Sequence, residues 1–240
     1  MAQAVSATGN QCQPRGDFER GVKTMQFFYS PQITPQLVIE GEKYRHLFKV
    51  RRTKKGDIVP VRNLKEDWLY FYRIEDVNRK RGILKLEKKE WKPVLPSKYL
   101  HLGWCIVEPK RVEKTLPHLN EIGVSKISFV YCDFSQRHFR LKMKRIEKIL
   151  IESCQQCGRS KIPEIEILNS SLEFFQKYPH FTAIDFDGEE LESSTTLALV
   201  GPEGGFSAKE RKRFSKIAGL KGFILKSETA ICGVASKILL

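Results

Sequence analysis

Residues 197–210 read LALVGPEGGFSAKE, and the order of elements in this stretch indicates the architecture of the second half of the chain. The apolar run LALV is typical of a buried strand, and GPEGG at 201–205 follows it directly. Ser207 and Glu210 then have the S-x-x-E spacing of a capping box, which starts a helix. Glycines at the carboxyl end of a parallel strand let a ligand approach the backbone, and ligands bind open α/β sheets at that edge. The stretch therefore predicts a ligand-binding loop, although a tight structural turn fits the same pattern.

The last strand-to-helix connection repeats this arrangement near the C-terminus. From Gly222 the chain reads GFILKSETAICGVASKIL, which predicts a strand at 221–225, a polar turn and a final apolar helix. Together the two connections can wall a single pocket. A Ser-Glu-Thr turn also suits any helix start, so a purely structural role stays open. The glycine loop itself has neither the Lys-Ser/Thr of a Walker loop nor the G-x-G-x-x-G spacing of a dinucleotide site.

Strands and helices alternate through the rest of this half. Near-continuous apolar runs predict further strands at 100–107, 125–132, 181–186 and 195–200. Helical spacing of apolar residues predicts helices at 110–122, 139–157, 171–178 and 208–218. This alternation implies a mostly parallel sheet covered by helices on both faces, an α/β domain that we place at 97–240.

Short apolar runs broken by turns dominate the N-terminal half. They predict strands at 27–29, 37–39, 57–61, 68–74 and 82–87, with one short helix at 42–52. The segment WKPVLPS at 91–97 has two prolines and no periodicity, which is typical of a linker. We therefore expect a small β-barrel domain at 25–93.

The positive charge of this first domain favours RNA as a binding partner. Residues 25–95 contain 17 Lys and Arg against 9 Asp and Glu, interleaved with the aromatic residues Trp68, Tyr70, Phe71 and Tyr72. The whole chain of 240 residues carries a formal charge of +14, which favours a polyanionic partner. Alternatively, the charge forms a plain solvated surface and the aromatic side chains form ordinary barrel core.

Composition excludes several classes of protein. At 41% hydrophobic residues and with no long apolar run, the chain is typical of a globular protein and not of a disordered or membrane-spanning one. Residues 1–24 lack an apolar signal region, and we expect them to be a disordered extension. Six scattered cysteines are too few for a disulfide scaffold and fit a reduced cytoplasm. Cys154 and Cys157 form a CxxC without a second ligand pair, so we interpret them as helix residues and expect no metal.

Six short motifs follow one another in register between Met25 and Leu240. They comprise His46, Val50, Arg52, Gly56 and Asp57; Glu121, Ile122, Gly123 and Val124; Arg137; Glu152, Gln156, Gly158 and Arg159; GPEGG at 201–205; and Leu225, Glu228, Thr229 and Ala230. In this order they resemble the RsmE-type family, the 16S ribosomal RNA uridine-N3 methyltransferases of the SPOUT superfamily. The departures from the family pattern are Arg51 for Leu, Lys221 for Gly, Lys226 for Arg and Ser227 for Thr.

The resemblance implies a PUA-like β-barrel followed by a SPOUT α/β domain with a C-terminal trefoil knot, acting as a homodimer. It implies S-adenosylmethionine as the cofactor, without a metal. It also implies a cytoplasmic enzyme that methylates N3 of a uridine in the decoding region, in 16S ribosomal RNA or in the assembled small ribosomal subunit. No membrane is expected as a partner.

Site residues follow from the matched motifs. For catalysis we expect Glu228 as the base that removes the uridine N3 proton, Glu203 as the second choice, and Lys226 beside the substrate. Lys226 lacks the bidentate fork of the family Arg. For the cofactor we expect Val200, Gly201, Pro202, Glu203, Gly204, Leu220, Leu225, Ser227, Thr229 and Ala230. For RNA we expect Arg52, Arg62, Arg137, Gln156 and Arg159, although Gln156 and Arg159 also fit plain surface positions.

Three alternatives stay open at this stage. One is a SPOUT methyltransferase that acts on another RNA base. Another is a ribosome-associated RNA-binding factor without catalysis, which would not bind S-adenosylmethionine. A nucleotide-binding hydrolase is disfavoured because the glycine loop has no lysine and the chain lacks an Asp signature for Mg²⁺.

Overall fold

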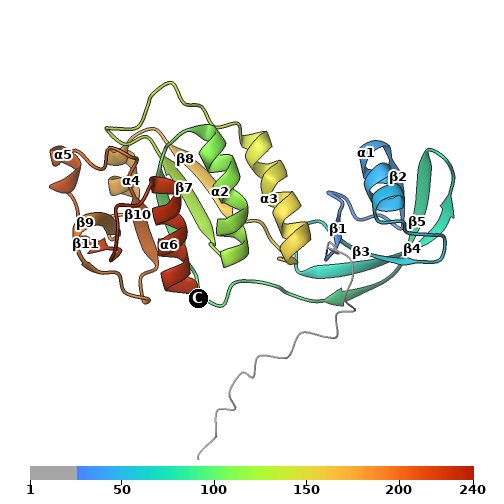
Figure 1. The fold of residues 1–240 in the computed structure, drawn as a ribbon. Helices are drawn as coiled ribbons and strands as arrows, with labels where there is room; N and C mark the ends of the chain where they lie inside the picture. Colours follow the sequence, from blue (N-terminus) through green and yellow to red (C-terminus); the bar gives the residue numbers. More distant parts are fainter. Residues whose placement is uncertain (1–25) are drawn as a thin grey trace, which may run out of the picture.

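Two separate sheets make up the described part of the chain, residues 26–240 of the computed structural model (Figure 1). The first sheet has five strands in the order β1-β3-β4-β5-β2, and the second has six in the order β11-β9-β10-β6-β7-β8. The extension predicted at 1–24 lies outside the described residues.

The N-terminal β domain contains the first sheet. Its strands are β1 (Phe28–Tyr29), β2 (Gln36–Glu40), β3 (Ile58–Arg62), β4 (Trp68–Val77) and β5 (Arg81–Trp91). Two register shifts between β4 and β5 help to curl the sheet around an apolar core that includes Val61 and Tyr72. A short helix, α1 (Gly41–Tyr44), continues into the π-helical segment η1 (Arg45–Val50) and adds Leu47 and Phe48 to this core. The predicted β domain with one short helix is confirmed.

The second sheet is parallel throughout and forms the parallel-sheet domain. Its strands are β6 (His101–Cys105), β7 (Lys126–Val130), β8 (Glu164–Leu168), β9 (Thr182–Glu190), β10 (Leu197–Val200) and β11 (Lys216–Gly219). Its helices are α2 (Pro109–Ile122), α3 (Met143–Cys157), α4 (Ser171–Lys177), α5 (Ala208–Arg211) and α6 (Ser227–Leu239).

Helices cover both faces of this sheet (Figure 1). On one face α2, α3 and α6 pack on a core that contains the fully buried Trp104 and Phe129. On the other face Phe174 of α4 packs with Phe181 and Phe206. The inner strands β6, β7 and β10 are buried on both sides, which explains their near-continuous apolar sequences. The predicted α/β architecture is confirmed.

Two predictions near the C-terminus were wrong. The strand expected at 221–225 is instead β11 at Lys216–Gly219, and the helix expected at 208–218 stops as α5 at Arg211. In β11 only four residues pair with β9, and Ala218 is the apolar side chain that reaches the core. The segment 221–225 is exposed, so its apolar side chains are not those of a buried strand. In addition, β8 was not predicted because its sequence, EIEIL, alternates charged and apolar residues at a sheet edge.

The structure also contains a buried disulfide that the sequence did not predict. It joins Cys105, the last residue of β6, to Cys132, just beyond the adjacent strand β7, with a Cα–Cα distance of 5.6 Å. Within residues 26–240, no helix combines the length and the apolar character needed to cross a bilayer.

The two domains are joined along α3 and the start of the linker. Gln155 of α3 accepts hydrogen bonds from the backbone N–H of Tyr29, at 2.8 Å, and of Gln26, at 2.7 Å. Asp67 lies 2.7 Å from both Ser160 Oγ and Lys161 Nζ. A small apolar cluster that includes Phe27, Leu69 and Cys154 fills the junction. Side chains of both domains therefore fix the position of the β domain beside α3.

Candidate functional site

The glycine loop and the start of α6 meet at the carboxyl edge of the parallel sheet. Ser227, the first residue of α6, donates a hydrogen bond from Oγ to the carbonyl oxygen of Gly201 at 2.6 Å. The same Oγ accepts a hydrogen bond from Trp104 Nε1 at 2.9 Å, and all three groups are largely shielded from solvent. Two of the loops singled out in the sequence therefore lie against each other.

Close packing explains the glycines of the loop. A Cβ at Gly201 would lie only 3.1 Å from the ring of Phe206, a residue of the core beneath. Gly205 has φ of +70°, a left-handed conformation that glycine adopts without strain. Phe134, from the loop after β7, lies over Gly204.

A capping box ends the loop and ties it to its neighbour. Ser207 Oγ accepts a hydrogen bond from the backbone N–H of Glu210, and Glu210 accepts one from the N–H of Ser207. The second oxygen of the Glu210 carboxylate accepts a hydrogen bond from the N–H of Asp133 at 3.0 Å. The predicted capping box is confirmed, and it links the glycine loop to the loop that follows β7.

Arg111, in the first turn of α2, joins carboxylates from different loops. Its Nη1 donates to Glu228 Oε1 at 3.0 Å and lies 3.3 Å from Glu203 Oε1. Its Nε lies 3.4 Å from Glu108 Oε2. The charge of Glu228 raises the pKa of Arg111 above its ordinary value, partial desolvation opposes this shift, and Glu203 and Glu108 reinforce it.

One oxygen of this cluster has no partner. Glu228 Oε2 is buried and accepts no hydrogen bond from the described residues, whereas Oε1 is held by Arg111. A buried carboxylate oxygen without a donor is unfavourable, so such atoms often mark a binding site. Here the free oxygen can accept a proton or a hydrogen bond from a bound N–H group.

The segment before α6 supplies apolar side chains at the same edge. Phe223 and Ile224 are 94% and 83% exposed, and Leu225 is 38% exposed. Leu220 leans on α6, where a Cβ at Gly233 would lie 3.2 Å from its side chain. The site thus combines backbone, carboxylates and an apolar wall.

The structure brings together most of the residues predicted for the cofactor and for catalysis. Val200, Gly201, Pro202, Glu203 and Gly204 form one side, and Ser227, Glu228, Thr229 and Ala230 form the other. Leu220, Leu225 and Lys226 lie in the connecting segment, where Lys226 is exposed at the start of α6.

Residues predicted for RNA are placed in two different ways. Arg52, Arg137 and Gln156 are exposed. Arg62 is only 2% exposed, and its guanidinium donates to the carbonyl oxygens of Asp67, Trp68 and Lys92. Arg159 is also buried and donates to Asn120. These placements favour structural roles for Arg62 and Arg159, because each guanidinium is buried and donates to protein oxygens, although the buried Nε of each has no partner among the described residues.

Sequence reasoning missed Arg111. Its position in the sequence could have indicated a role in the site. Arg111 lies in the first helical turn after the buried strand at 100–107, and the carboxyl end of that strand is on the same edge of the sheet as the glycine loop. Cys154 and Cys157 lie on α3 as predicted, and burial raises the pKa of Cys154 to about 12. Within residues 26–240, no group of three or more His, Cys, Asp or Glu side chains is arranged to hold a metal ion.

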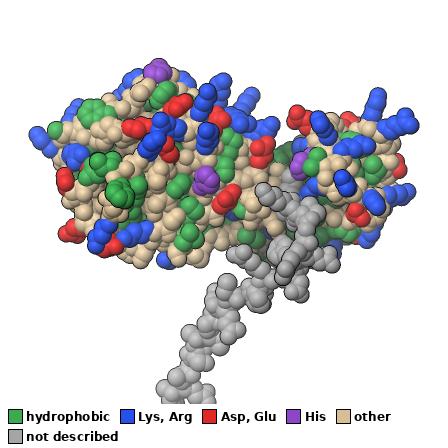
Figure 2. Space-filling model, in the orientation of Figure 1, with side chains coloured by type: hydrophobic (Ala, Val, Ile, Leu, Met, Phe, Trp, Pro, Cys, Tyr) green, Lys and Arg blue, Asp and Glu red, His purple; other side chains and the backbone are tan. Residues whose placement is uncertain are grey.

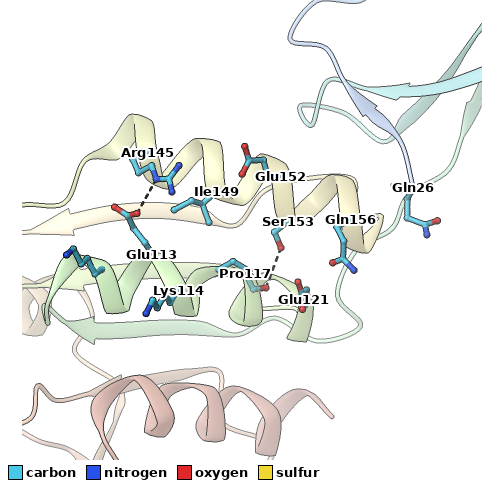
Figure 3. A pocket seen from close by; sticks show the side chains of 11 residues that line it. Gln26, Glu113, Lys114, Pro117, Glu121, Arg145, Ile149, Glu152, Ser153 and Gln156 are labelled. Carbon is cyan, nitrogen blue, oxygen red and sulfur yellow. Dashed lines mark hydrogen bonds and ion pairs between the residues drawn. The ribbon is translucent and has the colours of Figure 1, made fainter. Parts of the chain in front are cut away.

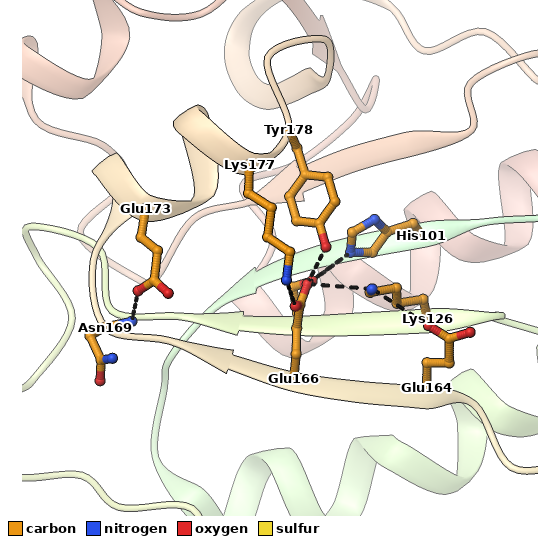
Figure 4. A network of polar contacts seen from close by, with 9 residues as sticks. His101, Lys126, Glu164, Glu166, Asn169, Glu173, Lys177 and Tyr178 are labelled. Atoms are coloured by element: carbon orange, nitrogen blue, oxygen red, sulfur yellow. Dashed lines mark hydrogen bonds and ion pairs between the residues drawn. The ribbon is translucent and has the colours of Figure 1, made fainter.

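A second polar cluster lies between the strands β6, β7 and β8 and the end of α4 (Figure 4). Ser128 Oγ donates to Glu166 at 2.5 Å and lies 2.5 Å from His101 Nε2, while Tyr178 and Lys177 donate to the same carboxylate. The serine stands between the histidine and the acid, which is not the order of a Ser-His-acid triad. His101 is also buried, so this cluster is structural.

Two family models match the chain. One, described as an RNA methyltransferase domain, matches residues 95–239, and one described as an RNA methyltransferase PUA domain matches residues 39–87. The chain is 42% identical over 222 residues to the ribosomal RNA small subunit methyltransferase E of Helicobacter pylori, an alignment that covers 88% of this chain and 98% of that protein. The protein of the same name from Buchnera aphidicola is 28% identical over 215 residues, covering 82% of this chain and 87% of the relative.

A solved structure shares the fold. The ribosomal RNA small subunit methyltransferase E of Neisseria gonorrhoeae, bound to S-adenosyl methionine, superimposes with a TM-score of 0.72 at 19% identity, covering 88% of this chain and 95% of that one. The matched family model spans more than half of the sequence, and the Helicobacter relative is matched over nearly its whole length. The chain therefore belongs to the ribosomal RNA small subunit methyltransferase E family.

Proposed function

We propose that this chain transfers a methyl group from S-adenosylmethionine to N3 of a uridine in 16S ribosomal RNA. The observation that carries the proposal is the pair of carboxylates, Glu203 and Glu228, that Arg111 holds together between the glycine loop and α6. Membership of the family supports the reaction class, and the names of the relatives support the ribosomal RNA substrate.

The residues at this edge fit S-adenosylmethionine. A cationic cofactor suits a glycine loop that carries a carboxylate, Glu203. Its neutral adenosyl part suits glycine-loop backbone and the apolar side chains of Leu220 and Leu225. We propose that Val200, Gly201, Pro202, Glu203, Gly204, Leu220, Leu225, Ser227, Thr229 and Ala230 hold it.

The chemistry asks for a base. When bound, S-adenosylmethionine supplies a methyl group for direct displacement, which positioning accelerates. Uridine N3 carries a proton at neutral pH, and a carboxylate within reach can remove it. Glu228 accepts this proton on the free Oε2, while Arg111 fixes the carboxylate through Oε1. Glu203 anchors the other side of Arg111, and Lys226 contacts the substrate.

The wider assignment follows the same proposal. Residues 25–93 dock RNA and residues 97–240 carry the reaction, in keeping with the two matched family models. Arg52, Arg137 and Gln156 contact RNA, whereas the buried Arg62 and Arg159 are left out of this set. We further propose a homodimer, a trefoil knot in the C-terminal segment, 16S ribosomal RNA within the assembled small subunit as the substrate, and the cytoplasm as the location.

Substitution of the base tests the mechanism. Glu228→Gln keeps the size of the side chain but cannot take a proton, so single-turnover methylation should fall by at least about 100-fold. Binding of S-adenosylmethionine, measured by calorimetry, should persist. Glu121→Gln, an exposed carboxylate at the end of α2, should methylate like the wild type.

Each other outcome has a defined meaning. An unchanged rate in Glu228→Gln with cofactor bound would show that the base is another group. No heat with S-adenosylmethionine in the wild type would favour an RNA-binding factor without catalysis. Mapping of modified uridines in ribosomal RNA from cells with and without the protein identifies the target nucleotide.

A further inference from the structure

A strongly basic exposed segment of the parallel-sheet domain lies at residues 137–148. It contains six Lys and Arg residues, Arg137, Arg140, Lys142, Lys144, Arg145 and Lys148, and a single carboxylate, Glu147. All six basic residues are exposed. The segment consists of the end of the loop after β7 and the first turns of α3. Among the described residues, Lys142 and Lys144 have no ion-pair partner, so their charges are available to a ligand.

This segment leads into a cleft between the two domains. Lys144 and Lys148 lie one helical turn apart on the face of α3 that lines the cleft. Lys43, His46 and Arg51 of the N-terminal β domain line the opposite wall. The cleft has a volume of about 800 Å³, and Tyr29 adds an aromatic side chain to its lining. Figure 2 shows Lys and Arg side chains gathered above the parallel-sheet domain and around the β domain across this hollow.

At its other end the same loop reaches the candidate site. Asp133 donates its backbone N–H to Glu210 and accepts a hydrogen bond from Ser207 Oγ at 2.5 Å. Phe134, 53% exposed, lies over Gly204. The loop that leads into the basic segment therefore contacts the glycine loop at one end, while Lys144 and Lys148 of α3 line the cleft towards the N-terminal β domain.

A second groove, between α2 and α3, has balanced charges (Figure 3). It is also about 800 Å³, but its three cations, Lys110, Lys114 and Arg145, are balanced by Glu113, Glu121 and Glu152. Arg145 is paired with Glu113 at 3.1 Å. The cleft towards the β domain has four cations and a histidine against the three carboxylates Glu42, Glu147 and Glu152. One of its cations, Lys148, lies 3.9 Å from Glu152, so the cleft keeps a small excess of positive charge.

We propose that residues 137–148 and this cleft bind the phosphate backbone of the RNA strand that flanks the methylated nucleotide. The inference rests on the proposed function and adds the path that the substrate takes over the protein. Cations placed along a surface bind a polyanion by neutralising phosphates and releasing counterions, which gives affinity without base specificity. Tyr29 offers a ring at which an unpaired base can stack.

The salt dependence of RNA binding tests this path. The double variant Lys144→Ala/Lys148→Ala removes two phosphate contacts, so log K against log salt should become shallower by about 1.4, at about 0.7 per single-stranded contact. Affinity at a fixed salt concentration should fall on the order of tenfold. The probe is a 16S ribosomal RNA fragment that contains the target uridine, bound to the full chain.

Two further variants control for folding and for general charge. Lys144→Arg/Lys148→Arg keeps both charges and should bind like the wild type, with the same thermal unfolding. Lys110→Ala/Lys114→Ala removes two lysines with the same spacing on α2, in the balanced groove, and should leave the slope unchanged.

The outcomes separate this inference from the proposed function. If Lys144→Ala/Lys148→Ala binds RNA with the wild-type slope while the wild type methylates it, the path is wrong and the function stands. If the slope falls as expected but the wild type methylates no uridine, the path stands and the function fails. If only binding to assembled subunits weakens and naked RNA is unaffected, a protein partner replaces RNA and the proposal is overturned.

Discussion

At the scale of single residues, Arg111 has the largest influence on the candidate site. It is the side chain of α2 that reaches both the glycine loop, through Glu203, and α6, through Glu228. Without it two carboxylates from different loops would face each other, and like charges at such distances repel. The guanidinium therefore sets both the charge and the geometry of the proposed base.

Replacement of Arg111 should lower the rate of methyl transfer more than RNA binding. We expect Arg111→Met to reduce single-turnover methylation about 100-fold because Glu228 loses its fixed orientation, with KM for RNA changed less than about threefold. Arg111→Lys keeps the charge but not the fork, and should recover part of the rate. Lys114→Met, one turn along α2, is the matched control. A wild-type rate in Arg111→Met would remove this arginine from the mechanism.

Buried and exposed arginines show what a sequence can and cannot predict at this scale. The GPEGG loop, the capping box of Ser207 and Glu210, and the approach of Ser227 to Gly201 follow from local spacing and strand order. Arg62 does not, because its partners are carbonyl oxygens of Asp67, Trp68 and Lys92, which meet only in the folded domain. From the sequence alone, an arginine such as Arg62 is therefore predicted to be exposed, although the folded domain buries it.

At the scale of elements, the polar cluster in Figure 4 joins β6, β7 and β8 to α4 through His101, Ser128, Glu166 and Lys177. Burial and then the charge of Lys126 lower the pKa of His101 to about 4, although Glu166 opposes this shift. Burial alone would raise the pKa of Glu166. Hydrogen bonds from Lys177, Ser128 and Tyr178 lower it instead to about 2.

Acid should therefore destabilise the protein in two steps. In the unfolded chain His101 binds a proton as the pH falls through about 6.5, whereas in the folded chain it stays neutral until the pH reaches about 4. From pH 7 to pH 5 this difference should reduce the free energy of unfolding by about 2 kcal/mol. Glu166 adds a further loss between about 4.5 and 2, because its folded pKa is also the lower one. The free energy of unfolding, measured by urea titration at each pH, shows both losses.

A variant isolates the histidine. The other histidines of the described chain, His46, His118, His138 and His180, are exposed, so most of the loss between pH 7 and pH 5 should disappear in His101→Gln. His118→Gln should keep the wild-type loss. Equal losses in His101→Gln and the wild type would assign the acid sensitivity to other groups.

Elements with strong periodicity were predictable, and short ones were not. Helices α2 and α3 are long enough for the 3.6-residue pattern to show, and β6, β7 and β10 are buried apolar runs. By contrast, β11 has only four residues, and the more apolar segment that follows it, at 221–225, is exposed. Hydrophobicity alone therefore favours residues 221–225 over β11 as the strand. The reason is that a loop beside a proposed binding site also carries apolar side chains.

At the scale of the whole molecule, the junction between the domains sets the shape of the cleft beside α3. Asp67 is 5% exposed and accepts hydrogen bonds from Ser160 and Lys161, while its carbonyl oxygen accepts one from the backbone N–H of Lys92. These contacts connect the turn before β4 to the segment after α3 and to the linker. Loss of the Asp67 charge should therefore loosen the domains from each other while each keeps its own core.

The variant Asp67→Asn tests this coupling. It keeps the size of the side chain but loses the charge that faces Lys161, which should lower the free energy of unfolding by about 2 kcal/mol. Urea unfolding should become less cooperative, because each sheet has its own core, and limited proteolysis should cut the linker at 92–99 faster. Glu87→Gln breaks the exposed ion pair with Arg73 in the same β domain and should change stability by less than about 0.5 kcal/mol. If both variants unfold like the wild type in one sharp step, the domains are held together by the apolar cluster around Phe27 and Leu69 instead of by Asp67.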